Sequence, residues 1–276
     1  MSKVVFTGCS FTAGNGWIDL PPGDSEKIEC KDSPSLWVNL CYNQLRQLKD
    51  LELVNYGVGG ASNAEIFKNT VNAISEYDQN IDIIFCQWTS MPRYQFNIGL
   101  ELWTTNEAFS PDSRSKFDVN LSNGTTWSGK YLDDLLDRFL VLQHLHNEII
   151  NVVEYSNILQ RLAQKFNIKL YFINGLCPWD QDYFIRLNNV LPEEYTPFTK
   201  DKILEIKFRS DEDIFKLYNK LHNDYNKAGG IDPTQWINLY SSILDNKIDV
   251  NYDKKHPGTQ SNQHYFQQVK TFLETQ

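Results

Sequence analysis

The side chains with the most evident chemistry are a serine near the start of the chain and an aspartate and a histidine near its end. Ser10 lies in Gly-Cys-Ser-Phe-Thr at 8–12, and Asp253 and His256 lie in Asp-Lys-Lys-His-Pro at 253–257. A serine hydroxyl is a poor nucleophile unless a nearby base takes its proton and a third group orients that base. Ser10 could supply the alcohol, His256 the base, and Asp253 the group that fixes the imidazole tautomer. The pattern indicates nucleophilic catalysis.

The negative oxygen that forms when a serine attacks a carbonyl needs hydrogen-bond donors already in place. The backbone N–H groups of Ser10 and Gly60 are the first candidates, because a glycine lets the backbone approach a substrate closely. Thr89 is the candidate for a third, side-chain donor. Gln87 is a weaker alternative, since its register along the chain would have to slip. The stretch 57–61, Gly-Val-Gly-Gly-Ala, is also typical of an ordinary strand-to-helix turn.

The order and positions of these stretches resemble the SGNH branch of the GDSL-like esterases. In that family the nucleophile lies near the N-terminus and an Asp-x-x-His-Pro stretch lies near the C-terminus, as Ser10, Asp253 and His256 do here. The resemblance spans the chain and implies a serine ester hydrolase with these three residues as a catalytic triad. Alone, Ser10 is more often a helix cap or turn residue, and His256 a surface histidine.

The chain departs from the family at two places. After the third apolar run the family carries Gly-x-Asn-Asp, whereas this chain reads Gln-Trp-Thr-Ser at 87–90. Thr89 thus stands where the asparagine is expected, and a hydroxyl donates one hydrogen bond but reaches less far than an amide. Cys9 replaces an aspartate that the family often has, and we interpret it as a small buried thiol.

Two residues beside the third donor are candidates for substrate binding. Trp88 offers an aromatic face, and Arg93 could bind an acidic or polar substrate group through two hydrogen bonds. A core aromatic and a structural ion pair are the alternatives. The remaining histidines show no partner pattern and are interpreted as structural: His144, His146, His222 and His264.

These side chains must be positioned by a framework of alternating strands and helices. Buried strands are predicted at 4–6, 51–56, 81–86 and 169–173, with helices starting at 33 and at 62 and others over about 131–166 and 261–274. This alternation predicts an α/β fold with a mostly parallel sheet covered on both faces. The resemblance implies a three-layer α/β/α sandwich with a flavodoxin-like sheet. Ser10, Gly60 and Thr89 each follow a strand, at the edge where such sheets carry their sites.

Three helix details are predicted more closely. Ser33 with Pro34 should cap and open one helix, and Ser62 with Glu65 should form a capping box for the next. The face of that second helix should be apolar, at Ala64, Phe67, Val71 and Ile74. The long helix should carry a stripe that includes Val153 and Leu159, and the last helix should bury Phe266, Val269 and Phe272 or Leu273.

Length and composition favour an ordinary globular enzyme. We expect the 276 residues to form a single domain with insertions at about 94–130 and 177–250. With 26 basic and 35 acidic residues, the net charge of -9 argues against nucleic-acid binding. Five cysteines without metal-like spacing favour a reducing compartment. No signal-peptide core or membrane span is evident, so a cytoplasmic location is the default expectation.

The sequence therefore leads to one main functional hypothesis and two alternatives. The main hypothesis is an esterase that removes small acyl groups, such as acetyl, from a carbohydrate or related polar small molecule. The alternatives are a binding or structural module whose catalysis is weakened, motivated by the changes at 87–90, and an O-acyltransferase that uses the same triad. No motif for a metal, nucleotide or other cofactor is present, and no feature indicates an oligomeric state.

Overall fold

The computed structural model describes residues 1–14, 33–89, 95–98, 101–104, 119–120, 126–127, 145–176, 233–238, 241–245, 247–250 and 256–275. The chain divides into two compact units. The first comprises Met1–Ser90, Tyr155–Trp179 and Asp232–Gln276, and the second comprises Met91–Glu154 and Asp180–Ile231. The predicted single domain with insertions stays a prediction. Two candidate site residues, Arg93 and Asp253, lie outside the described residues.

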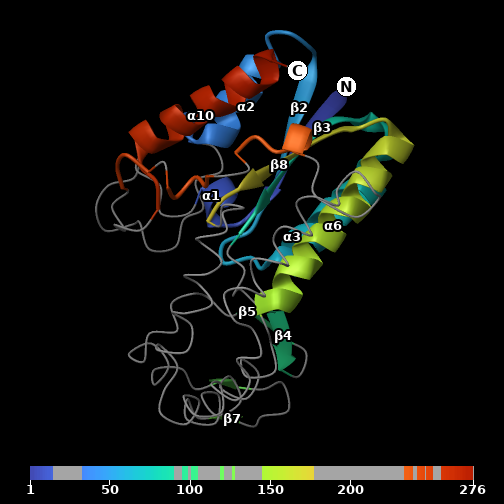
Figure 1. Cartoon of the computed structure of the whole chain (residues 1–276), viewed down its shortest axis with the longest axis vertical. Helices are drawn as coiled ribbons and strands as arrows, with labels where there is room; N and C mark the ends of the chain where they lie inside the picture. Colours follow the sequence, from blue (N-terminus) through green and yellow to red (C-terminus); the bar gives the residue numbers. More distant parts are fainter. Residues whose placement is uncertain are drawn as a thin grey trace. The chain divides into compact units, whose positions relative to one another are not determined.

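A four-stranded parallel sheet forms the centre of the first unit (Figure 1). Its strands, in spatial order, are β2 (Leu51–Gly57), β1 (Ser2–Gly8), β3 (Ile81–Trp88) and β8 (Lys169–Asn174). All four predicted strands are confirmed, each extended by one or two residues at one or both ends. The order, in which the chain steps back across β1 between its second and third strands, is the flavodoxin-like order. The predicted α/β fold class is confirmed.

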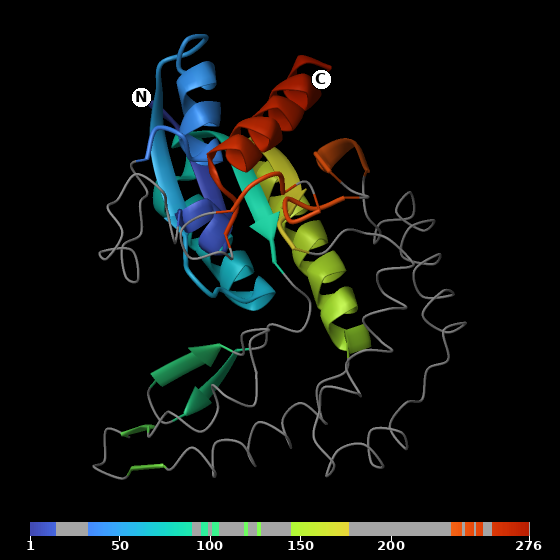
Figure 2. The same ribbon diagram turned by 90° about the vertical axis from the view of Figure 1, so that its left-hand side faces the viewer.

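Helices cover both faces of this sheet (Figures 1 and 2). One face carries α2 (Trp37–Leu45) and α10 (Thr259–Glu274), and the other carries α3 (Asn63–Tyr77) and the part of α6 (Leu145–Phe166) that belongs to the first unit. The short elements are α1 (Ser10–Ala13), η1 (Asp78–Asn80) and η3 (Pro233–Gln235). The second unit has two antiparallel strand pairs, β4 (Gln95–Ile98) with β5 (Glu101–Thr104) and β6 (Val119–Asn120) with β7 (Thr126–Trp127).

An aromatic row joins the sheet to α2 and α10. Phe6 and Phe85 are register partners on adjacent strands, and their rings stack with centroids 4.8 Å apart. Trp37 of α2 meets Phe6 edge-on at 5.3 Å and Tyr265 of α10 at 5.2 Å. Offset and edge-to-face pairs of this kind stabilise by about 0.5–1.5 kcal/mol beyond the area they bury. The sequence had not indicated Tyr265 as a core residue, although it is fully buried.

On the opposite face a polar pair is buried beneath α3. Thr7 of β1 and Thr70 of α3 share a hydrogen bond of 2.8 Å, and Thr70 also donates to the backbone carbonyl of Ile66. This pairing directs Thr70 and Ile66 at the sheet. The buried face of α3 is therefore offset from the predicted one: Ile74 is buried as expected, whereas Phe67 is half-buried and stacks on Tyr155 of α6 at 4.4 Å.

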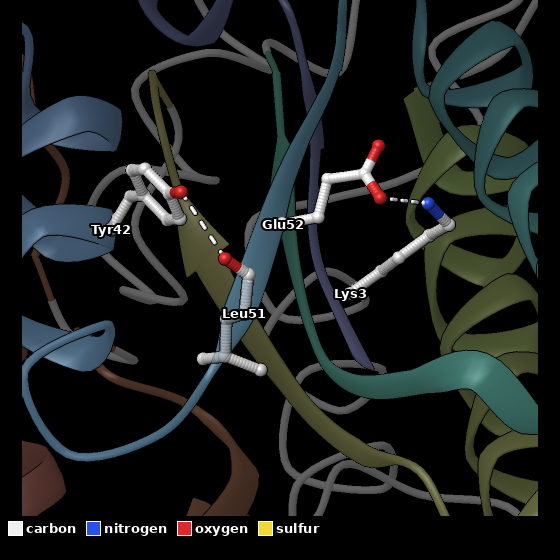
Figure 3. A network of polar contacts seen from close by, with 4 residues as sticks. All are labelled: Lys3, Tyr42, Leu51 and Glu52. Carbon is white, nitrogen blue, oxygen red and sulfur yellow. Dashed lines mark hydrogen bonds and ion pairs between the residues drawn. The ribbon is translucent and has the colours of Figure 1, made fainter. Parts of the chain in front are cut away.

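Side-chain contacts also fasten β2 at its amino end (Figure 3). Lys3 and Glu52 are register partners on β1 and β2, and their ion pair measures 2.6 Å. The hydroxyl of Tyr42 on α2 donates to the backbone carbonyl of Leu51 at 3.2 Å. Contacts of this partly exposed kind contribute little individually. The ion pair joins β1 to β2, and the Tyr42 hydrogen bond joins α2 to the strand that follows it.

The two predicted helix starts have different outcomes. The Ser62 hydroxyl accepts a hydrogen bond from the backbone N–H of Glu65 at 3.2 Å, which confirms the cap of α3. The predicted start at Ser33 is wrong, because α2 begins at Trp37. Residues 33–36 form a turn in which the N–H of Leu36 donates to the carbonyl of Ser33 at 3.1 Å. Pro34 suits the second position of such a turn as well as the first turn of a helix.

The long helix and the last helix agree in part with the predictions. Within the described residues α6 starts at Leu145, and the predicted portion before that residue lies outside them. Val153 and Leu159 are buried as expected. In α10, Val269 is buried, whereas the three other predicted core residues are half-buried: Phe266, Phe272 and Leu273.

A segment that the sequence did not identify as extended lies beside β8. Trp236 forms a parallel bridge with Phe172, and the N–H of Ile237 donates to the Phe172 carbonyl at 3.0 Å. Asn174 and Asn238 then exchange three hydrogen bonds of 2.8–3.1 Å between side chain and backbone. This segment covers the edge of the sheet that β8 would otherwise expose.

Among the described residues, no helix is both long and apolar enough to cross a membrane.

Candidate active site

Ser10 lies at the carboxyl end of β1, where the strand turns into the single-turn helix α1. Cys9 is still extended, with φ −90° and ψ −158°, and Ser10 is the first helical residue. The turn is closed by hydrogen bonds from the N–H of Ala13 to the carbonyl of Cys9 (2.9 Å) and from the N–H of Gly14 to that of Ser10 (3.0 Å). Gly14 ends the helix in the left-handed region at φ 79°, which a glycine adopts without strain. The Ser10 side chain is largely buried.

The neighbouring strand β2 approaches this turn closely. A Cβ atom on Gly57 would lie 2.5 Å from the backbone nitrogen of Ala13, so only glycine allows the two segments to pack as they do. Asn55 of β2 donates from its side-chain amide to the carbonyl of Thr12 at 2.9 Å, and its oxygen accepts from the N–H of Gly57 at 2.8 Å. The helix that carries Ser10 is thus held against β2.

The strand on the other side, β3, holds the same turn through one side chain. Gln87 is fully buried, and its amide donates to the sulfur of Cys9 at 3.3 Å. Its oxygen accepts a short hydrogen bond from the hydroxyl of Thr12. Because both ends of the amide bind residues that flank Ser10, Gln87 is a structural partner of the turn.

His256 comes to the same turn from the far end of the chain. Its ring meets the ring of Phe11, the residue after Ser10, edge-on, with centroids 5.7 Å apart and an interplanar angle of 80°. The segment that carries it is closed by an antiparallel bridge between Val250 and Pro257. Asp253 lies between those two residues, outside the described part of the chain.

The His256 segment is anchored to the start of α10 by Asp249. Its carboxylate accepts hydrogen bonds from the backbone N–H groups of Gln260 (3.0 Å) and Ser261 (2.8 Å) and from the Ser261 hydroxyl (2.6 Å). Burial alone would raise the pKa of Asp249, but these hydrogen bonds outweigh burial and lower it. A Cβ on Gly258 would lie 2.5 Å from this carboxylate, so the close approach requires glycine.

A buried hydrogen-bonded path also joins the two segments. The indole of Trp37 donates to the backbone carbonyl of Phe11 at 3.1 Å, and the Trp37 backbone N–H donates to the side-chain oxygen of Asn262 at 3.0 Å. The Asn262 amide nitrogen in turn donates to the carbonyls of Pro257 (3.2 Å) and Gly258 (2.9 Å). Trp37 and Asn262 are both buried. Neither was identified from the sequence.

The predicted oxyanion donors lie at the ends of β2 and β3. Gly60 follows β2 in the left-handed region at φ 78°, which favours glycine there. Thr89 follows β3 and is fully buried; its backbone N–H donates to the side-chain oxygen of Asn63 at 2.8 Å. The Thr89 hydroxyl has no hydrogen-bond partner within the described residues. Asn63, the first residue of α3, was missed because it follows the capping serine in the sequence and reads as an ordinary first-turn residue.

Trp88 does not present a surface for substrate. Its side chain is 1 % exposed and stacks on Phe172 at 5.9 Å, with Tyr155 of α6 at 6.4 Å. This placement corrects the sequence-based assignment of Trp88 to substrate binding, because alternation along β3 directs position 88 into the face beneath α3 and α6.

His264, which the sequence analysis interpreted as structural, is exposed on α10 and hydrogen bonds to Gln268 at 3.2 Å.

The cysteines of the described residues are free thiols within the core. Cys9, Cys41 and Cys86 are all buried and unpaired as disulfides. Burial raises the pKa of Cys86 to about 12, despite hydrogen bonds from Thr7 and Thr70 that act to lower it. Burial also raises the pKa of Cys41. Within the same residues no group of three or more His, Cys, Asp or Glu side chains is placed to hold a metal ion.

Comparison with known proteins gives structural likeness only. No protein-family model matches the sequence, and no curated protein matches it. Solved structures that are similar include a carbohydrate acetylesterase from Sinorhizobium meliloti, with a TM-score of 0.44 at 10% identity over 100% of this chain and 99% of that one. A lipase from a goat rumen metagenome has a TM-score of 0.43 at 12% identity, over 99% of this chain and 97% of that one.

A third similar structure is a member of the lipolytic G-D-S-L family from Veillonella parvula. Its TM-score is 0.38 at 12% identity, over 98% of this chain and 97% of that one. At such identities and TM-scores these likenesses assign no activity to this chain.

Proposed function

We propose that this protein is a serine ester hydrolase that works through an acyl-enzyme on Ser10. The observation that carries the proposal is the ring contact between His256 and Phe11, which brings a histidine from the end of the chain to the turn that presents Ser10. A nucleophile and a base must lie within hydrogen-bonding reach of one another, often more loosely in the absence of substrate. The turn that carries Ser10 lies at the carboxyl edge of a parallel sheet, where such folds hold their sites.

The proposed reaction has two steps. The Ser10 hydroxyl attacks the ester carbonyl while His256 takes its proton, and the same proton then goes to the departing alcohol as the acyl-enzyme forms. In the second step His256 takes a proton from water, whose oxygen attacks the acyl carbonyl. The bond from that carbon to Ser10 then breaks, and the proton passes from His256 to the Ser10 oxygen as the acid leaves. Asp253 would fix the imidazole tautomer and stabilise its positive charge.

The negative oxygen of each tetrahedral intermediate would be held by the backbone N–H groups of Ser10 and Gly60. Thr89 is the proposed third donor. Its hydroxyl is a buried polar group without a partner among the described residues, and such groups are uncommon enough to need a reason. In related chemistry the removal of one oxyanion donor costs about 100- to 1000-fold in rate, so each of the proposed donors should matter.

For the substrate, we propose a small acyl group, such as acetyl, on a carbohydrate or related polar small molecule. The resemblance of the motifs supports this class, and Arg93 is the proposed contact for a polar substrate group. The net charge of -9 disfavours nucleic acid as a partner. The proposed setting is the cytoplasm.

The first test is hydrolysis of nitrophenyl acetate by the wild type, Ser10→Ala and His256→Ala. We expect both variants to lose at least about 1000-fold in kcat, since removal of one triad member typically costs that much or more. His264→Ala is the matched control, because this histidine is exposed on α10 and should leave kcat unchanged. Equal turnover by all four proteins would refute the proposal.

The second test separates a working hydrolase from a fold with weakened catalysis. That alternative is favoured by one observation: the N–H of Thr89 is already bound by Asn63 and its side chain is fully buried. A fluorophosphonate reacts with an activated serine, so stoichiometric labelling at Ser10 supports the hydrolase. An intact, folded protein that remains unlabelled would support the weakened module instead.

A further inference from the structure

We propose that Gln87 is a positioning residue that sets the geometry of Ser10 by holding the turn on both sides of it. For its effect on catalysis this inference rests on the proposed function, but its structural part does not. Gln87 touches no reacting atom in the proposed reaction. It acts through Cys9, the residue before Ser10, and through Thr12, two residues after it.

A buried amide in the middle of a core strand needs an explanation. Gln87 is fully buried in β3 between Cys86 and Trp88, which are also buried. Transfer of an unpaired amide out of water is unfavourable by several kcal/mol, so such a group persists only where hydrogen bonds satisfy it. The hydrogen bonds of this amide to Cys9 and Thr12 both go to the turn that carries Ser10. The polar residue therefore serves that turn and no other part of the sheet.

The surroundings of the amide are shaped to admit it. A Cβ atom on Gly8 would lie 2.6 Å from the Gln87 side-chain oxygen, and a Cβ on Gly175 would overlap its nitrogen. Gly8 ends β1 and Gly175 follows β8, so the strands on both sides of β3 lack a side chain at this level. The ends of β1 and β8 thus both leave room for the Gln87 side chain.

The turn depends on such outside support. Helix α1 has only four residues, and its first position has no side-chain cap. One turn of helix is unfavourable by itself, because it fixes several dihedral angles for very few hydrogen bonds. Asn55 holds the carbonyl of Thr12 from β2, and Gln87 holds its hydroxyl from β3. A displacement of about 1 Å can cost roughly 100-fold in rate. Loss of one support should therefore displace the Ser10 hydroxyl and slow the proposed reaction.

The test uses two variants that remove the Thr12–Gln87 hydrogen bond from opposite sides. Gln87→Met keeps the length of the side chain without its amide, and Thr12→Val keeps the shape of the threonine without its hydroxyl. The matched control is Thr70→Val, which removes a buried hydroxyl bonded to Thr7 on the other face of the sheet. All three should lose some stability, so stability alone does not decide.

The first readout is hydrogen exchange of the backbone amides of Ala13 and Gly14, whose partners are the carbonyls of Cys9 and Ser10. We expect exchange at these amides to rise at least about tenfold in Gln87→Met and Thr12→Val, relative to amides within β1, and to stay unchanged in Thr70→Val. The second readout is ester turnover per folded protein. There kcat should fall at least about tenfold in the first two variants with KM within about twofold, because positioning acts on the chemical step.

The outcomes separate this inference from the proposed function. If the wild type neither hydrolyses esters nor labels at Ser10, the function fails, while the exchange readout still decides whether Gln87 holds the turn. If turnover is present but exchange and kcat match the wild type in both variants, the inference is overturned and the function stands. An equal change in Thr70→Val also overturns it, since the effect would then reflect general loss of stability. Should Gln87→Met fail to fold, Thr12→Val decides by the same criteria.

Discussion

The imidazole of His256 packs edge-on against the ring of Phe11, with ring centroids 5.7 Å apart. This contact joins the two ends of the chain at the residue that follows Ser10. It is reinforced by the path from the Phe11 carbonyl through Trp37 and Asn262 to the carbonyl of Pro257, all of it buried hydrogen bonding. The segments that carry His256 and Ser10 are therefore fastened to each other and not only to the sheet.

Phe11→Leu should lower the esterase activity without abolishing it. The substitution keeps an apolar side chain but removes the edge-to-face contact, which stabilises by about 0.5–1.5 kcal/mol. We expect kcat on nitrophenyl acetate to fall by roughly 2- to 12-fold, because 1.36 kcal/mol corresponds to a factor of ten. The control is Phe67→Leu, which removes a stack with Tyr155 on the other face of the sheet. An unchanged kcat in Phe11→Leu would show that the contact does not orient the imidazole.

Gly57→Ala should displace the helix that carries Ser10. The new Cβ would lie 2.5 Å from the nitrogen of Ala13 and 2.7 Å from the carbonyl carbon of Thr12, both of them backbone atoms that cannot rotate away. Overpacking of this kind costs about 1–3 kcal/mol. We expect a matching loss of stability in urea unfolding together with slower fluorophosphonate labelling of Ser10.

Leu51→Ala is the control for Gly57→Ala. It creates a cavity at the opposite end of the same strand, where Leu51 is buried and pairs with Ser2. We expect about 2–5 kcal/mol of lost stability from this change, with the labelling rate of the folded protein preserved. Equal labelling rates in both variants would mean that Gly57 matters for stability alone.

Glu148→Gln should change how stability depends on pH. Burial raises the pKa of Glu148 to about 7, although a hydrogen bond from Asn151 acts to lower it. Between its ordinary value near 4.5 and about 7 the unfolded chain has released this proton and the folded chain has kept it, so wild-type stability falls as pH rises through that window. Glutamine removes the effect, and we expect the variant to be more stable at pH 8 by roughly 1–3 kcal/mol. Urea unfolding from pH 4 to 8 measures this, with the exposed Glu154→Gln as control.

The four strands and their positions along the chain could be predicted because each is a short apolar run. Residues 81–86, for example, are apolar except for Asp82, and the parallel fold that follows from strand and helix alternation brings the ends of β1, β2 and β3 to one edge. This is why Ser10, Gly60 and Thr89 could be placed after strands from the sequence alone. The cap at Ser62 was also readable, since a hydroxyl three residues before a glutamate is a local signal.

What could not be predicted depends on contacts between distant residues. Gln87 stands as a polar residue within an apolar run, which was the one available signal, but its partners Cys9 and Thr12 belong to another strand end. The buried face of α3 was offset because Thr70 faces Thr7, and two threonines can satisfy each other in a core. The segment beside β8 pairs through backbone hydrogen bonds, such as the one from the Ile237 N–H to the Phe172 carbonyl. Backbone groups are the same in every residue, so this pairing could not be predicted from the pattern of side chains.

Asp249→Asn should weaken the anchor of the His256 segment, and it should do so only where the carboxylate is charged. The hydrogen bonds from Gln260 and Ser261 lower the pKa of Asp249 despite its burial, so its stabilisation is fully present above the ordinary value of 3.8 and is lost as pH falls through the lower folded value. A charged cap at a helix N-terminus contributes about 1–2 kcal/mol. We expect urea unfolding to show this difference between wild type and variant from pH 5 to 8, and the two curves to converge below pH 3.8. Asp50→Asn, an exposed carboxylate ahead of β2, is the control. A difference that persists unchanged at acidic pH would mean that the carboxylate charge does not hold this helix start.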